Sequence, residues 1–202
     1  MRIIALPLIL SLAGCSTLGA LTAPARGVYE LLPADDSPRQ CARRTGTELV
    51  VETPKTRSTL DTDRIMIRPG ALEAQYLPDA QWGDSVPVML QTLLVRGFAR
   101  YDAFSHVGRA PLGAAGDYAL ISEIEDFNAE VSEAGPQVRL TVDAQLVREG
   151  DARVAARSRF AVTRPAASTK TADLVPAFDA AARDLTAQIT AWGLRAMGTG
   201  CR

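Results

Sequence analysis

The chain has 202 residues, of which 47% are hydrophobic and 22% are charged, with 22 Lys and Arg against 23 Asp and Glu. This composition predicts a folded protein rather than a disordered one, and the length suits one domain with its own hydrophobic core. The net charge of −1 argues against nucleic acid as the main partner, because such a partner requires a basic surface.

The first residues have the pattern of an export signal. One positive charge, Arg2, precedes a short apolar run, and small residues stand directly before Cys15. The run is too short to span a bilayer, which takes roughly 20 apolar residues. We predict a secretory signal peptide over residues 1–14, a tether over residues 15–26 and a single domain over residues 27–202. One interpretation of this pattern is that Cys15 carries a lipid. The alternative is an ordinary signal peptide in which the cysteine is coincidental.

Two further cysteines, Cys41 and Cys201, remain if Cys15 carries a lipid. An exported protein enters an oxidising compartment, where an even pair of cysteines most simply forms a disulfide. The predicted bridge would hold the C-terminal tail against the segment that precedes most of the strands. Two free thiols or a metal site are the alternatives, although two cysteines and the single histidine do not make a tetrahedral ligand set.

Short strands are predicted in the first part of the domain. Runs of apolar or alternating residues indicate strands over residues 27–33, 47–53, 64–68 and 71–77. Pro69-Gly70 separates the last two of these runs and is typical of a turn.

A helix is predicted from Val86 to Tyr101. Asp84 or Ser85 can cap it, and Pro87 falls in its first turn, where a missing N–H does no harm. Apolar residues recur at steps of three and four, namely Val86, Met89, Leu90, Leu93, Leu94, Gly97, Phe98 and Tyr101. The opposite face carries Gln91, Thr92, Arg96 and Arg100. We interpret the apolar stripe as facing the core; a partner groove or a membrane surface is the alternative.

The most regular periodicity predicts a β-hairpin. In residues 137–147 and 153–163 the apolar positions are even-numbered, which is typical of two strands with one solvated face. Because both sets are even, the connecting loop must have an odd number of residues. We predict a three-residue loop over 149–151, which places Val142 opposite Ser158, and likewise Ala144 opposite Ala156 and Asp143 opposite Arg157.

The preceding strand, residues 117–131, changes parity along its length. Its apolar residues are even-numbered up to Ile124 and odd-numbered from Phe127 onward. A β-bulge near Glu125-Asp126 would reconcile the two halves. Together with the hairpin, this strand completes a predicted antiparallel meander of three strands.

A second helix is predicted over residues 171–196. One side carries Leu174, Phe178, Ala181, Leu185, Ile189, Trp192 and Ala196, and Gly198 and Gly200 follow its end. The expected fold is therefore α+β in two layers: a mainly antiparallel β-sheet with two long amphipathic helices packed on one face.

The sequence contains few signs of catalytic chemistry. His106 is the single histidine, and neither a Gly-x-Ser-x-Gly elbow nor a phosphate-binding glycine loop occurs. Asp61-Thr62-Asp63 resembles half of a calcium loop but lacks its glycine and its later glutamate, so we interpret it as an acidic turn. We predict a protein that is not an enzyme and that has no cofactor and no metal site.

Leu12-Ala13-Gly14-Cys15 resembles the lipobox of bacterial lipoproteins. This resemblance implies that Cys15 is lipidated and becomes the new N-terminus. Ser16 follows, where lipoproteins retained on the inner membrane usually carry Asp, so the resemblance favours the outer membrane of a Gram-negative bacterium.

Residues 60–70, residues 76–82, the helix that follows and Gly116-Asp117-Tyr118-Ala119-Leu120 resemble the ABC-type transport auxiliary lipoproteins, the group that includes the paraquat-inducible protein C type. The resemblance extends from Tyr29 to the end of the last helix. It implies a small periplasmic domain, tethered to the outer membrane, that works beside an MCE-domain protein and an ABC transporter in moving lipids. It brings no catalytic residues.

Tyr76 and Trp82 are two aromatic residues in a stretch that we expect to be rich in loops and exposed. We predict that they contact the partner, together with Asp61 and Asp63, because aromatic anchors dominate interface energies. The alternative is that Trp82 is a core residue at the end of the sheet. Two competing functions are a structural lipoprotein of cell-envelope assembly and lipid carriage by the domain itself, which would need a cavity of several hundred Å³.

Overall fold

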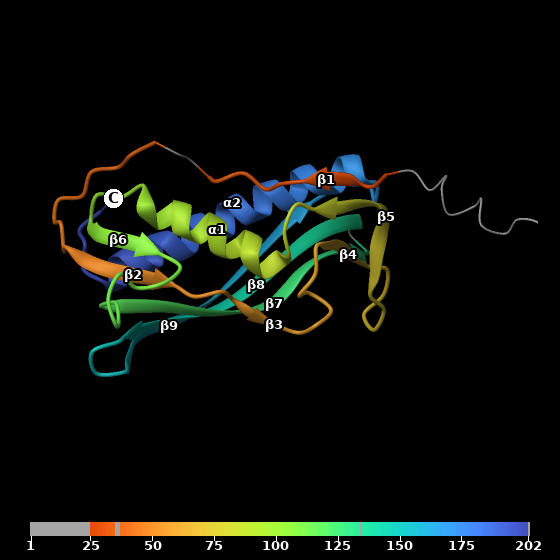
Figure 1. Cartoon of the computed structure of the whole chain (residues 1–202). Coiled ribbons are helices and arrows are strands. Elements are labelled where there is room, and N and C mark those ends of the chain that lie inside the picture. The colour runs from red at the N-terminus through yellow and green to blue at the C-terminus, as the bar shows by residue number, and fades with distance from the viewer. Residues whose placement is uncertain (1–24, 35–36, 134, 202) are drawn as a thin grey trace, which may run out of the picture.

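The computed structural model describes residues 25–34, 37–133 and 135–201. Within them, two helices lie side by side on one face of a nine-stranded sheet (Figure 1). The strands are β1 (Gly27–Tyr29), β2 (Thr47–Val51), β3 (Lys55–Thr56), β4 (Arg64–Arg68), β5 (Gln75–Trp82), β6 (Phe104–Gly108), β7 (Tyr118–Ser132), β8 (Gly135–Arg148) and β9 (Arg153–Pro165). The helices are α1 (Val86–Ala99) and α2 (Thr171–Ala196). The predicted α+β class with both helices on one face is confirmed.

The long strand β7 organises the sheet. On one edge it pairs with β8, which in turn pairs with β9, both antiparallel, so the predicted meander is confirmed. Along its other edge β2, β3 and β4 follow one another, each parallel to β7. The sheet is therefore mixed. Period two identifies a strand but carries no information on the direction of its partner, which is why the parallel pairings were not predicted.

The predicted bulge in β7 is confirmed. The register against β8 shifts between Ile124 and Asp126, so Ile124 and Phe127 both face the helices. The change of parity in the sequence is thus the direct consequence of one extra residue in this strand.

The predicted register of the β8–β9 hairpin is wrong by two residues. Val142 lies opposite Phe160 instead of Ser158, and Asp143 opposite Arg159 instead of Arg157. The loop has four residues, 149–152, and a bulge between Leu146 and Val147 restores the parity. A shift by two residues keeps the same side chains on the same face, so the apolar pattern alone could not distinguish the two registers.

The predicted strand over residues 71–77 is also misplaced, because β5 extends from Gln75 to Trp82 and runs through Pro78. Proline cannot donate to a ladder, so its position in the sequence indicates the end of a strand. In the structure the β4–β5 register is interrupted between Arg64 and Met66, which accommodates the proline at an irregularity. The strand predicted over residues 27–33 is shortened to β1.

The core lies between the helices and the sheet. The apolar stripe of α1 is buried, as predicted, but Gln91 is only 4% exposed although it was assigned to the solvent face. Its Nε2 donates a hydrogen bond of 2.8 Å to the Val51 carbonyl, which compensates for its burial. The two helices approach closely at Gly193, where an added Cβ would lie 2.8 Å from Cζ of Phe98.

Candidate functional site

The acidic turn Asp61-Thr62-Asp63, just before β4, forms main-chain hydrogen bonds with both the end of β5 and the start of α1. The carbonyl of Asp63 accepts a hydrogen bond of 2.6 Å from the Trp82 amide, and the carbonyl of Thr62 accepts one of 3.1 Å from the Val86 amide. Three of the segments that carried the family resemblance, residues 60–70, residues 76–82 and the helix after them, thus meet at one structural junction. Their main-chain contacts give them a role in the fold itself.

Trp82 is buried, so the prediction of an exposed aromatic residue in a loop is wrong. The side chain is 1% exposed and makes edge-on contacts with Phe127 and Phe178, with ring centroids 6.2 and 5.2 Å away. It ends a strand whose inner face is covered by α2. The alternation of Ala80 and Trp82, both buried, is the sequence signal that favours this core position.

The other predicted partner residues differ in exposure. Tyr76 is half-buried: its hydroxyl donates to the Thr59 carbonyl at 2.9 Å, and the Arg64 guanidinium lies 4.5 Å from its ring centroid. Asp63 is half-buried and Asp61 is exposed. Within this set, Asp61 is the side chain that a partner reaches most readily.

The predicted disulfide is present and joins Cys41 to Cys201. The carboxylate of Asp102 holds the segment around Cys41 in place. It accepts a hydrogen bond of 2.7 Å from the Cys41 amide and forms an ion pair of 2.7 Å with Arg44. The Cys41 N–H, followed by the Arg44 guanidinium, lowers the pKa of Asp102. The segment around Cys41 is therefore held both by the disulfide to Cys201 and by polar contacts with Asp102.

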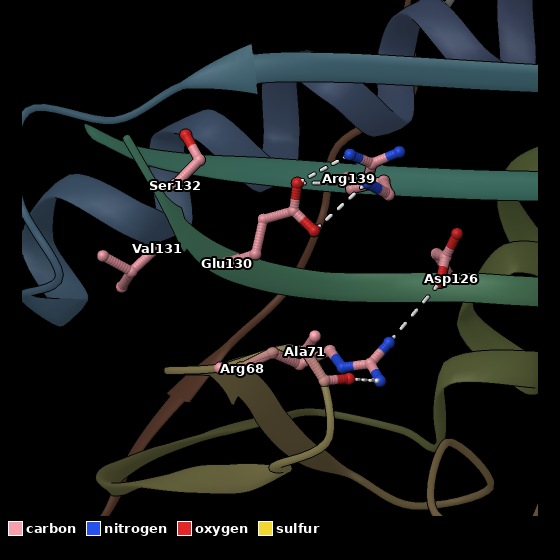
Figure 2. A pocket seen from close by; sticks show the side chains of 8 residues that line it. Arg68, Ala71, Asp126, Glu130, Val131, Ser132 and Arg139 are labelled. Atoms are coloured by element: carbon pink, nitrogen blue, oxygen red, sulfur yellow. Dashed lines mark hydrogen bonds and ion pairs between the residues drawn. The ribbon is translucent and has the colours of Figure 1, made fainter. Parts of the chain in front are cut away.

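A polar groove lies on the face of the sheet that the helices do not cover, where β4, β7 and β8 meet (Figure 2). It has a volume of about 420 Å³, and its charged side chains are Arg68, Asp126, Glu130 and Arg139. This site has no counterpart among the predicted site residues. The spacing of its residues gives no motif, since Arg68 reaches β7 only through the parallel pairing of β4.

The charges of the groove are paired. Arg139 Nη2 lies 2.8 Å from Glu130 Oε1, and Arg68 Nη1 lies 4.0 Å from Asp126 Oδ1. The hydrogen bonds from Arg139, and then the one from Gln137, lower the pKa of Glu130, and Glu130 in turn raises the pKa of Arg139. Glu130 and Arg139 therefore keep their charges near neutral pH.

We expect the Glu130–Arg139 pair to contribute to the free energy of unfolding in a pH-dependent way. A carboxyl whose pKa is lowered by folding stabilises the protein above its usual pKa of 4.5, and this stabilisation is lost as the pH falls through the lower folded value. Glu130→Gln should therefore differ from the wild type by at most about 1 kcal/mol at pH 7, since the pair is partly exposed. Urea unfolding from pH 7 to pH 3 should show this difference closing.

Arg139→Gln is the matched variant, because it removes the donor and leaves the carboxylate. It should lose the same pH-dependent part of the stability. A difference between the wild type and Glu130→Gln that persists unchanged at pH 3 would contradict the assignment.

The predicted signal peptide and lipidated cysteine concern residues that the structure does not describe. The predicted absence of a metal site can be compared with the described residues. Cys15 and residues 1–14 lie outside the described structure. In the described part of the chain, no group of three or more His, Cys, Asp or Glu side chains is placed to hold a metal ion. None of the helices formed by these residues is both long enough and apolar enough to cross a membrane.

The chain is similar to several known proteins. Residues 29–190 match the profile of the family described as ABC-type transport auxiliary lipoprotein component. An uncharacterized protein of Bradyrhizobium diazoefficiens is 26% identical over 192 residues, covering 92% of this chain and 50% of that protein. The chain thus spans about half the length of this curated relative.

Solved structures support the same fold. A crystal structure of a Xanthomonas campestris protein of family DUF330 is 26% identical, with a TM-score of 0.76, and covers 85% of this chain and 97% of that one. A second crystal structure, of an uncharacterized protein, is 15% identical with a TM-score of 0.65, covering 84% and 99% of the two chains, and shows the likeness of fold alone. The two-layer domain is thus one already seen in experimental structures. The chain belongs to the ABC-type transport auxiliary lipoprotein component family.

Proposed function

We propose that the protein is a non-catalytic auxiliary component of an ABC/MCE-type lipid transport system, anchored in the outer membrane by a lipid on Cys15, and that it docks the transporter to that membrane. The observation that carries this proposal is the extent of the family match. It runs from residue 29, in β1, to residue 190, in α2, so the auxiliary role belongs to the folded domain as a whole.

The lipobox supports the anchoring part of the proposal. A single acyl chain gives only marginal membrane binding, and additional chains make the anchor stable, at about 0.8 kcal/mol per buried methylene. The sequence Cys15-Ser16 favours the outer membrane over the inner one. The periplasmic domain would then be held beside its transporter.

The polar groove supports a role without catalysis. A carboxyl group that acts as a general acid near neutral pH requires a raised pKa. Glu130 instead has a lowered pKa because Arg139 binds it. Its carboxylate forms an ion pair of 2.8 Å with Arg139.

The exposed acidic turn is the partner-facing region in this proposal. Asp61 is exposed, with Asp63 half-buried beside it, whereas the hydroxyl of Tyr76 is engaged internally and Trp82 belongs to the core. Asp61→Arg should reduce partner binding without affecting the fold. Glu123→Arg, at another exposed acidic position, on β7, is the control.

The test is affinity purification of the tagged protein from detergent-solubilised membranes, followed by mass spectrometry. We expect an MCE-domain protein and the permease and ATPase of a transporter to co-purify. Cys15→Ser should move the folded domain to the soluble periplasmic fraction and abolish complementation of a deletion strain. Recovery of envelope-assembly proteins in place of the transporter would contradict the proposal and favour the structural alternative, and full complementation by Cys15→Ser would contradict the need for the anchor.

A further inference from the structure

The chain enters the described structure at one particular end of the sheet. β1 runs parallel to β5, with Gly27 opposite Ala80, and Arg26 Nε donates to the Pro78 carbonyl at 3.3 Å. Ala25 and Arg26, the first described residues, therefore lie toward the end of the sheet at which β5 begins. We name this region, made of the β4–β5 turn (residues 69–74) and the end of β7 at Val131-Ser132, the entry end.

The parallel pairing of β4 with β7 brings these two segments together. Arg68, the last residue of β4, lies opposite Glu130, so the β4–β5 turn begins beside the end of β7. The polar groove lies between them and is lined by residues of both, including Ala71 and Val131 (Figure 2). The entry end is thus one continuous surface formed by segments about sixty residues apart in sequence (131 − 71 = 60).

The length of the predicted tether keeps the entry end near the membrane. Cys15 and Ala25 are separated by 25 − 15 = 10 residues, which span at most about 35 Å when fully extended. β7 has 15 residues, and a strand of that length measures about 50 Å. A lipid on Cys15 therefore holds the entry end within reach of the bilayer surface and leaves the opposite end of β7 farther from it.

Two large apolar side chains are exposed at the entry end. Leu72, in the β4–β5 turn, is 102% exposed, and Val131 is 46% exposed. Moving a fully exposed leucine into an apolar environment is favourable, because it removes apolar surface from water. Leu72 is outside the core, so packing within the domain does not explain an apolar residue in this turn. A bilayer would provide an apolar environment for its side chain.

The charges of the groove match the head group of a zwitterionic phospholipid. Each guanidinium already pairs with a carboxylate, Arg139 with Glu130 and Arg68 with Asp126, and all four side chains remain partly exposed. The exposed part of each guanidinium suits a phosphate, and the exposed part of each carboxylate suits an ammonium group. Arg68 Nε is buried without a hydrogen-bond partner among the described residues. Equal numbers of positive and negative groups favour a zwitterionic surface over an anionic one.

We propose that the entry end docks on the zwitterionic phospholipid surface to which the protein is tethered, with Leu72 inserted at the boundary between head groups and acyl chains and the polar groove lying over the head groups. This inference rests on the proposed function, because the lipid on Cys15 delivers the entry end to the bilayer. It adds a fixed orientation, in which the opposite end of the domain faces away from the membrane.

The test places a tryptophan at each end of the full-length, lipidated protein. Leu72→Trp reports on the entry end, and Leu112→Trp is the matched control, since Leu112 is 76% exposed in the loop before the start of β7. Both variants are reconstituted in phosphatidylcholine vesicles with brominated acyl chains, which quench tryptophan at the acyl boundary. We expect Leu72→Trp to lose most of its added emission and Leu112→Trp to lose none.

Sedimentation with the vesicles separates the two levels of the proposal. Failure of the lipidated protein to sediment would overturn the anchor itself. Sedimentation without quenching of Leu72→Trp, or with equal quenching of Leu112→Trp, would overturn the docking of the entry end and leave the anchor intact. Quenching of Leu72→Trp that requires added phosphatidylglycerol would overturn the assignment of a zwitterionic surface.

Discussion

Replacing Cys41 and Cys201 together by serine should lower the free energy of unfolding by up to about 5 kcal/mol. The disulfide joins residues 160 positions apart, and a bridge that closes so long a loop removes much of the conformational freedom of the unfolded chain. Domains of this kind are stable by only 5–15 kcal/mol, so the change is a large share of the total. Urea unfolding followed by circular dichroism measures it.

The reductant dithiothreitol provides the control for this experiment. The wild type should lose stability when reductant is present, and the Cys41→Ser/Cys201→Ser variant should not respond to it. Identical unfolding midpoints of the two proteins under non-reducing conditions would contradict a stabilising bridge.

Trp82→Ala should lower the free energy of unfolding by about 3–5 kcal/mol, as for other large aromatic residues truncated in a core. The ring is 1% exposed and packs between Phe127 of the sheet and Phe178 of α2. Removing it leaves a cavity at the point where the two layers meet. Urea unfolding of the variant at pH 7 measures the loss.

Leu72→Ala is the matched control, since Leu72 is fully exposed in the same half of the chain. Its stability should stay within about 0.5 kcal/mol of the wild type. If Trp82→Ala were as stable as Leu72→Ala, the buried position of the tryptophan would be wrong and its role as a partner contact would regain support.

The sequence predicts the pairing of the two cysteines more directly than it predicts the position of Trp82. Cys41 and Cys201 could be paired by counting, once Cys15 had been assigned to the lipid. For Trp82 the sequence leaves two placements open, a partner contact in a loop and a core residue at the end of the sheet, and the structure shows the second. Strand β5 continues past Pro78 through an irregular register with β4, which depends on the neighbouring strand and not on the local sequence.

The sequence by itself determined the elements whose signal is local. The second helix was predicted with the bounds that α2 has, and the bulge in β7 was predicted from the parity of Ile124 and Phe127. A periodic apolar pattern reports directly which side of an element is buried, so one strand or helix is enough to detect it. The resemblance to the family was carried by short segments in the same way.

Only the tertiary structure decided which segments meet. The parallel placement of β4 beside β7 brings Arg68 to Asp126 and Glu130 and thereby forms the polar groove, and the pairing of β1 with β5 sets the end at which the chain enters. The burial of Gln91 and the two-residue shift of the β8–β9 register likewise depend on neighbours distant in sequence. Such contacts arise from packing between elements. Local periodicity carries no information on the partner or direction of a strand, and it fixes the register only to within steps of two residues.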